Sequence, residues 1–124
     1  TVWQSLALAN TMAGLAANRR YAFHSVGALG VIEMTAPDRA GAVARGLKRL
    51  GVAPAARRYF DIHASLDVKH SIAWNAEAIA PLAESDPRYA RAMAEGALMR
   101  LEAGRRCFER YREEFAGVAF AQAA

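Results

Sequence analysis

The stretch from His63 to His70 constrains the fold of this chain most strongly, because it aligns three polar side chains on one helical stripe. It lies inside a run with helical spacing that extends from Pro54 to Pro81. At about 100° per residue, Asp67 projects roughly 40° from His63, and His70 projects roughly 20° to the other side. The same stripe carries apolar residues at Ala56, Phe60 and Trp74. We therefore expect the triplet to face a protein core.

A buried triplet of this kind needs partners. Burying a carboxylate and two imidazoles without them is unfavourable by several kcal/mol, so the stripe requires an internal hydrogen-bond network or a cation. A metal ion satisfies all three groups, and this ligand set suits iron or manganese better than magnesium or a thiolate zinc site. The other interpretation stays open at this point: two His and an Asp on a helix also occur as surface residues or as a local His–Asp pair.

The composition predicts an all-α fold. Hydrophobic residues make up 54% of the 124 residues, and the chain has only four prolines. No long stretch alternates Val, Ile and Thr with polar residues as strands do. This length allows at most one domain. We expect one helical domain over residues 1–124, in which four or five helices pack as an antiparallel bundle.

Proline, glycine and capping residues predict the helix boundaries. Thr35 to Asp38, which include Pro37, predict a stop and a restart, and Gly51 suits a C-terminal cap. A bend is expected near Ser65, and the stretch Ser85–Pro87 predicts a further cap. The expected helices are residues 2–34 (as one helix or two in line), 37–50, 54–79 and 87–115, with a frayed tail from Gly117. The last helix is expected to face inward at Ala90, Ala94, Ala97, Leu101, Gly104, Phe108, Tyr111 and Phe115.

Glu33 is the second unusual feature, a lone carboxylate on the apolar stripe of the first long helix. Gly27 and Gly30 narrow this helix and allow another backbone to approach closely. In a bundle, facing helices build a site in the middle, so we expect Glu33 to meet the triplet there. A position near a helix end that reaches solvent is the alternative for Glu33. His24 falls on the opposite face from Glu33, which indicates a structural role.

Charge and cysteine content exclude several function classes. The net charge of +4 is spread along helices without an aromatic-interleaved basic patch, so we expect no nucleic-acid partner. Cys107 is the single cysteine, which excludes an intrachain disulfide and indicates a reduced, cytoplasmic setting. No signal peptide or membrane span is evident, so we expect no membrane association. The chain opens on Thr-Val-Trp-Gln in what reads as helix interior, from which we expect an upstream segment.

Several motifs together resemble the haem-oxygenase-like di-metal oxidases, also labelled iron-containing redox enzymes. The H-x3-D-x2-H element, preceded about 30 residues earlier by a Glu, is a fairly specific combination. The resemblance covers nearly the whole chain and corresponds to the C-terminal half of that fold. It rests on the runs 27–35, 46–51 and 59–63, on Asp67 and His70, and on Glu95-Gly96-Ala97.

The resemblance implies a partial haem-oxygenase-like fold and a centre of two irons, or iron with manganese, that reacts with O2 as co-substrate. It implies that Glu33, His63, Asp67 and His70 are four of six metal ligands. The other two, a Glu and a His on an earlier helix, have no counterpart here, so we expect a missing N-terminal segment to supply them. Such a centre hydroxylates, desaturates or cleaves a small organic substrate.

The sequence leaves alternatives to this function. One is a metal-free catalyst on the same fold, resembling the thiaminase-like or quinone-cofactor-synthase branches, and another is a non-catalytic helical interaction module. A homodimer is also left open. Around the predicted centre, Asp61 and Glu77 are candidates to hydrogen-bond the histidine rings. Trp74, Tyr59 and Tyr89 are candidates either to line a pocket or to pack in the core.

Overall fold

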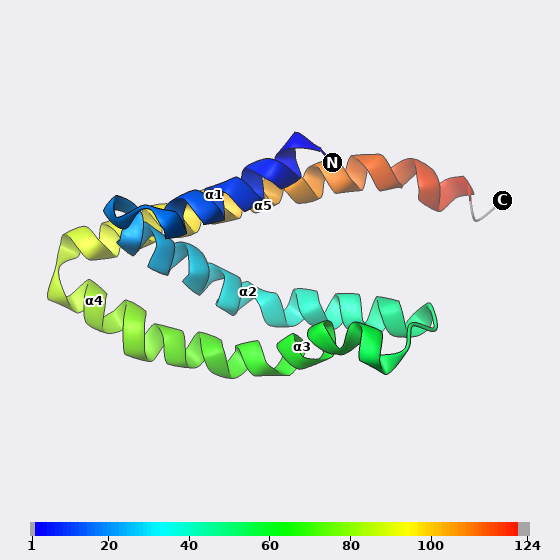
Figure 1. Ribbon diagram of the computed structural model, residues 1–124, viewed down its shortest axis with the longest axis horizontal. Helices are drawn as coiled ribbons and strands as arrows, with labels where there is room; N and C mark the ends of the chain where they lie inside the picture. Colours follow the sequence, from blue (N-terminus) through cyan, green and yellow to red (C-terminus); the bar gives the residue numbers. More distant parts are fainter. Residues whose placement is uncertain (1, 122–124) are drawn as a thin grey trace.

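The structure is a computed structural model that describes residues 2–121, and these residues form helices joined by short turns (Figure 1). No strand occurs among residues 2–121, which confirms the all-α prediction. The elements are α1 (Trp3–Ala17), a 3-10 turn (Arg19–Tyr21), α2 (Ala22–Arg49), α3 (Pro54–Trp74), a π-helical segment η2 (Asn75–Ile79), α4 (Ala80–Ser85) and α5 (Pro87–Ala121).

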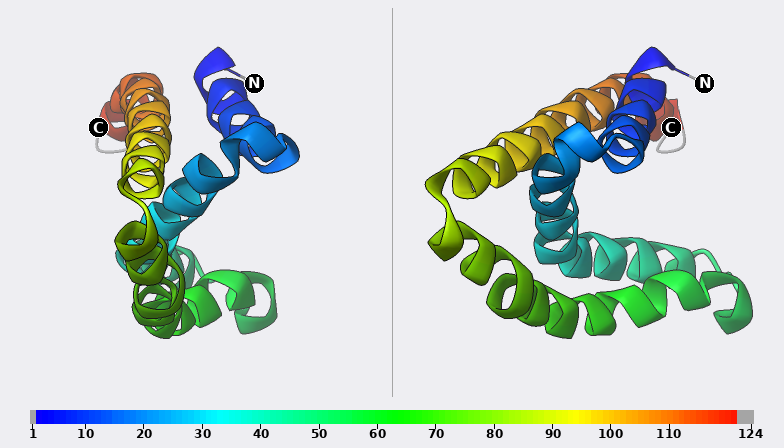
Figure 2. Two further views of the ribbon diagram at one scale, coloured as in Figure 1. Left: turned by 90° about the vertical axis from the view of Figure 1, so that its left-hand side faces the viewer. Right: turned by 60° about the vertical axis from the view of Figure 1, so that its left-hand side comes forward.

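Helix α2 lies at the centre of the bundle. Figure 1 and Figure 2 show α1 running antiparallel to α5 on one side, and α3 with α4 running antiparallel to α2 on the other. Helix α2 packs against both α3 and α5, whereas α1 packs mainly against α5. The predicted antiparallel bundle is thus present as two antiparallel pairs that share α2 as the connecting layer. None of the described helices is long and apolar enough to cross a membrane.

The first chain break lies at Asn18, and the predicted break at Thr35–Asp38 is wrong. The Asn18 side chain accepts a hydrogen bond from the Arg20 backbone N–H (3.1 Å), and the chain turns there so that α2 leaves the direction of α1. Helix α2 instead continues through Pro37 for 28 residues. Proline removes one helical hydrogen bond, but packing of α2 against both neighbouring layers outweighs that local preference.

The turn between α2 and α3 confirms the glycine cap. Gly51 has a φ of 75°, a left-handed conformation that favours glycine. The Gly51 N–H donates to the Lys48 carbonyl (3.1 Å) and the Val52 N–H donates to the Leu47 carbonyl (3.0 Å). These two bonds form a Schellman motif, which reverses the chain and makes α3 antiparallel to α2.

The helical run that begins with α3 does not end at Pro81, and it is continuous through Ser65. The chain stays helical through the π-helical segment η2 and into α4, which holds Pro81 in its first turn. Position i−4 from Pro81 is Glu77, in the middle of η2, so the wider turn lies where proline removes a hydrogen bond. The predicted cap at Asp86 is confirmed, because its carboxylate accepts from the Arg88 backbone N–H (2.8 Å).

Two glycines bring α2 and α5 into backbone contact. A Cβ at Gly27 would lie 1.9 Å from the Met93 carbonyl oxygen, and a Cβ at Gly96 would lie 1.9 Å from the His24 carbonyl oxygen. The contact is therefore reciprocal: each helix places a glycine against the carbonyl three residues before the glycine of the other. This confirms the prediction that Gly27 permits close approach of another backbone.

The glycine contact also explains why the predicted inner stripe of α5 is only partly right: Gly104 is buried and Ala90 and Ala97 are half-buried, but its larger residues are exposed. The residues of α5 that are buried are Met93, Gly96, Gly104 and Cys107, while Leu101, Phe108 and Phe115 are exposed. Gly96 must face α2, and this rotates the helix away from the orientation that its largest apolar residues favour. Helix α5 also continues to Ala121 where a frayed tail was expected; residues 122–124 of that predicted tail lie outside the described residues.

We predict that Gly96→Ala destabilises the protein by more than about 2 kcal/mol, because the added methyl meets backbone and forces α2 and α5 apart. The matched control is Gly46→Ala in α2, where a Cβ meets nothing within 4 Å. That change should stabilise the protein by up to about 1 kcal/mol through helix propensity. Urea denaturation of both variants checks this, and equal effects of the two would contradict a backbone contact.

Candidate metal centre

Three of the four predicted ligands converge between α2 and α3. The His70 Nδ1 atom lies 3.5 Å from the Glu33 Oε2 atom and 3.5 Å from the Asp67 Oδ1 atom. One ligand atom from each of the three residues lies within 4.8 Å of the other two. Glu33 comes from α2, and Asp67 and His70 come from successive turns of α3. The structure thus brings Glu33 close to two residues that follow it by 34 and by 37 positions in the sequence. We call these three residues the donor cluster.

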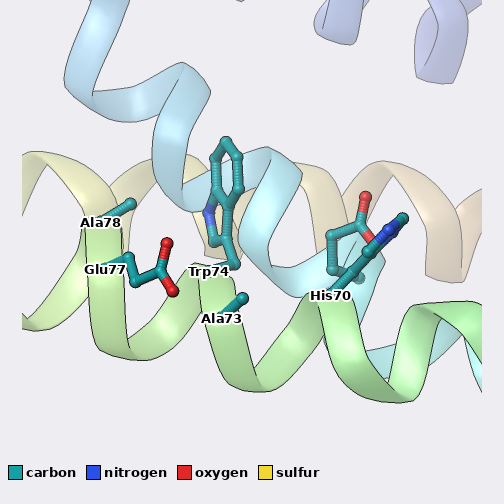
Figure 3. A pocket seen from close by; sticks show the side chains of 6 residues that line it. His70, Ala73, Trp74, Glu77 and Ala78 are labelled. Atoms are coloured by element: carbon teal, nitrogen blue, oxygen red, sulfur yellow. The ribbon is translucent and has the colours of Figure 1, made fainter.

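A tryptophan aligns α3 with α2 at the donor cluster. The Trp74 indole N–H donates to the Val26 carbonyl oxygen (3.1 Å). Its ring occupies the space left by Gly30, where a Cβ would lie 3.0 Å from the indole. Figure 3 shows Trp74 and His70 projecting from α3 on the side of α2. Asp67 and His70 lie on the preceding turns of α3. The contact between Trp74 and α2 therefore places them opposite Glu33.

The donor cluster carries buried negative charge without a permanent cation. Asp67 is only 4% exposed, and the Glu33 side chain is 20% exposed. The Glu33 Oε2 atom is buried with no hydrogen-bond partner, and within residues 2–121 no Lys or Arg lies within salt-bridge distance of either carboxylate. Leaving two such groups without a counter-charge is unfavourable by several kcal/mol.

The two distances from His70 fit ligands of a single metal ion. A separation of 3.5 Å is too long for a strong hydrogen bond. Two ligand atoms bound to one ion at about 2.0–2.2 Å lie roughly 3 to 3.5 Å apart. Two carboxylates and an imidazole suit iron or manganese. The His70 side chain is 50% exposed, so the cluster is open to small molecules on one side, whereas the triplet was expected to face a core throughout.

His63 lies apart from the donor cluster. Its Nδ1–H donates to the Tyr59 carbonyl oxygen (2.7 Å), and its ring stacks on Tyr59 with 4.0 Å between centroids. Because a carbonyl oxygen only accepts, this bond places the proton on Nδ1 and leaves Nε2 as a free electron-pair donor. Metal-binding histidines have this arrangement. Its role as a fourth ligand stays a prediction.

The other predicted residues have different roles. Asp61 accepts from Arg57 (2.9 Å), so its proposed hydrogen bond to a histidine ring is wrong. His24 contacts Glu95 on α5 (3.2 Å) and takes no part in the donor cluster. Tyr89 stacks on Phe23 (3.8 Å). Glu77 lies beside the donor cluster.

Two cavities meet at the donor cluster. One, of about 500 Å³, is lined by Glu33 and His70 together with Trp74, Glu77 and two alanines (Figure 3). The other, of about 520 Å³, is lined by Glu33, Asp67 and His63 and extends between α2, α3 and α5. Glu33 borders both. The donor cluster is therefore accessible from two sides, an arrangement that allows two different small molecules to approach it.

Two arginines, Arg39 and Arg100, line the larger cavity, and neither was predicted as a site residue. Arg39 donates from Nη2 to the Thr35 hydroxyl (2.5 Å) and from Nε to the Thr35 carbonyl (3.1 Å), and it lies 6.0 Å from the centre of the Phe108 ring. Thr35 and Arg39 are four residues apart, so the sequence alone could have predicted that the two side chains interact on one face of the helix.

The comparisons with known proteins agree with this geometry. A family profile described as "Iron-containing redox enzyme" matches residues 1–105. No curated protein and no solved structure matches. The matched residues include the whole donor cluster and His63, and they cover most of the chain. The resemblance drawn from the sequence is confirmed: the chain belongs to the family of iron-containing redox enzymes.

Proposed function

We propose that this protein is a non-haem iron oxidase or oxygenase that uses O2 to oxidise a small organic substrate. The observation that carries the proposal is the convergence of Glu33, Asp67 and His70 around buried, uncompensated carboxylate oxygens. Membership of an iron-containing redox family supports the same choice of metal. A purely structural polar cluster would be expected to pair the Glu33 Oε2 atom with a hydrogen-bond donor.

The residues have distinct roles in this proposal. Glu33, Asp67 and His70 hold the metal, and the Nε2 atom of His63 is the additional ligand that the larger cavity offers. Ferrous iron held there would supply the electrons for the reduction of O2. The two carboxylates neutralise the charge of the metal, and the Tyr59 carbonyl keeps His63 in the tautomer that binds. Phe60 and Phe108 offer an apolar substrate a matching surface in the larger cavity.

A two-metal centre needs more ligands than these four residues provide. We infer that a further helix bearing a Glu and a His completes it, either from an N-terminal segment or from a second copy of the chain. Val43, Tyr59 and Phe108, which line the larger cavity, are all exposed large apolar or aromatic residues. Exposed apolar groups that line one cavity support a covering element, because such surfaces usually mark interaction sites.

A metal-free catalyst is less well supported. Cys107, the one thiol, is buried at the contact of α1 with α5, where its sulfur lies 3.6 Å from the Ser5 hydroxyl. It borders neither of the cavities that meet at the donor cluster. The chemistry available at those cavities is that of the carboxylates, the histidines and whatever they bind.

We predict that Asp67→Asn and His70→Gln each lower Fe(II) affinity at least about tenfold after anaerobic reconstitution, because each removes a ligand. The controls are Glu84→Gln, an exposed carboxylate on α4, and His24→Gln, the histidine outside the cluster. Bound iron is measured by inductively coupled plasma mass spectrometry, and O2 consumption is followed on the same samples. Wild-type iron binding by both cluster variants would overturn the proposed centre.

We predict that Glu33→Gln has effects of opposite sign in the metal-free and metal-bound protein. Without metal it removes a buried, unpaired charge and should raise the free energy of unfolding by about 1–2 kcal/mol. With Mn(II) at 100 times its dissociation constant, the wild type gains about 2.7 kcal/mol, and the variant should lose that gain. Thermal and urea denaturation measure both effects, with Glu84→Gln as control. Destabilisation of the metal-free variant would indicate a structural polar cluster instead.

A further inference from the structure

The lining of the larger cavity combines apolar side chains with charged groups of both signs. Ile32, Val43, Phe60 and Phe108 form its apolar lining. Glu33, Asp67 and His63 border it on the side of the donor cluster, and two arginines border it from α2 and α5. Its volume of about 520 Å³ lies in the range of small-molecule binding sites. A ligand in this cavity would therefore meet both negative and positive groups.

Arg100 is half-buried at this cavity without a partner. Its Nε atom is buried and makes no hydrogen bond. Its guanidinium lies where Gly104 leaves room, since a Cβ at Gly104 would be 2.6 Å from the Nη1 atom. Burial, followed by the positive charge of Arg39, lowers the pKa of the Arg100 guanidinium. Two guanidinium groups therefore border the same cavity, although their charges repel.

Other arginines of α5 contrast with this pair. Arg91 binds Glu95, Arg105 binds Glu102 and Glu109, and Arg110 binds Glu114. Within residues 2–121, neither Arg39 nor Arg100 has a carboxylate at salt-bridge distance. Arg100 is thus a half-buried guanidinium that lacks the carboxylate partner of these three arginines. This pattern is typical of a cationic subsite whose anion is supplied by a ligand.

We propose that Arg39 and Arg100 form an anion subsite, which selects an organic anion with an apolar body as the substrate of this centre. The anionic group binds between the two guanidiniums. The apolar body lies along Phe60 and Phe108 toward the donor cluster. The inference rests on the proposed function for the role of this ligand as substrate, but not for its binding.

Binding to metal-free protein tests the subsite. The probes are 4-phenylbutyrate and its uncharged analogue 4-phenylbutanamide, titrated calorimetrically into chelator-treated protein. Arg100→Gln and Arg39→Gln should each weaken 4-phenylbutyrate binding about tenfold, the effect of one charge-assisted hydrogen bond. Matched controls are Arg45→Gln on α2 and Arg112→Gln on α5, both exposed; they should change affinity less than twofold. Equal binding of the acid and the amide by the wild type would overturn the proposal.

Gly104→Ala is a second variant that keeps every charge. The added methyl should displace the Arg100 guanidinium at little expense of stability, because it meets the end of a flexible side chain, and 4-phenylbutyrate affinity should fall several-fold. Circular dichroism confirms folding of each variant. Unchanged affinity in Gly104→Ala and Arg100→Gln together would refute the subsite even if Arg39→Gln failed to fold.

Two further probes define the anion. Phenyl phosphate that binds more tightly than 4-phenylbutyrate would identify a phosphate as the preferred anionic group of the same subsite. Inorganic phosphate that competes equally with either would overturn the requirement for an apolar body. Fe(II) binding is measured separately without these probes. Loss of the anion subsite with intact iron binding, or the reverse, therefore distinguishes failure of this inference from failure of the proposed function.

Discussion

The backbone contact between α2 and α5 at Gly27 and Gly96 is the constraint on which the rest of the structure depends. It fixes the rotation of both helices, since only the faces that carry these glycines can touch. On α2, that rotation leaves Glu33 available to α3. On α5, Arg100 follows Gly96 by about one helical turn and so borders the larger cavity. Two glycines thus determine the positions of both Glu33 and Arg100 at the candidate site.

The charges at this site oppose the stability of the free protein. A core of small residues such as Ala28, Ala40 and Ala44 contributes modest apolar burial. The same core holds Asp67 and the buried, unpartnered Oε2 atom of Glu33, and two guanidiniums line a cavity beside it. Burying each charged group alone lowers the stability of the protein, and binding of a ligand of opposite charge offsets that loss. Conflicts of this kind between local preference and folded position are typical of functional sites.

Much of the site followed from spacing within single helices, and the errors arose where distant packing decided. The spacing of Asp67 and His70 and the apolar stripe around Glu33 correctly predicted that they meet. Pro37 was misjudged because contacts with two neighbouring helices outweigh one missing hydrogen bond. The rotation of α5 depends on a contact 69 residues away in sequence, between Gly96 and Gly27, which periodicity within α5 does not contain. The His63 ring hydrogen-bonds the Tyr59 carbonyl one turn earlier in the same helix, and the angular spacing of residues around a helix does not predict such a bond.

The π-helical segment explains how α3 keeps its alignment with α2 beyond the donor cluster. Both Trp74 and Ile79 reach the space beside Gly30, within 3.0 Å of where its Cβ would lie. In an α-helix, residues five apart point about 140° away from each other. The wider turn of η2 brings them toward one side, so both side chains hold α3 against the same glycine. Sliding of α3 along α2 would have to break both contacts, and this keeps Asp67 and His70 level with Glu33.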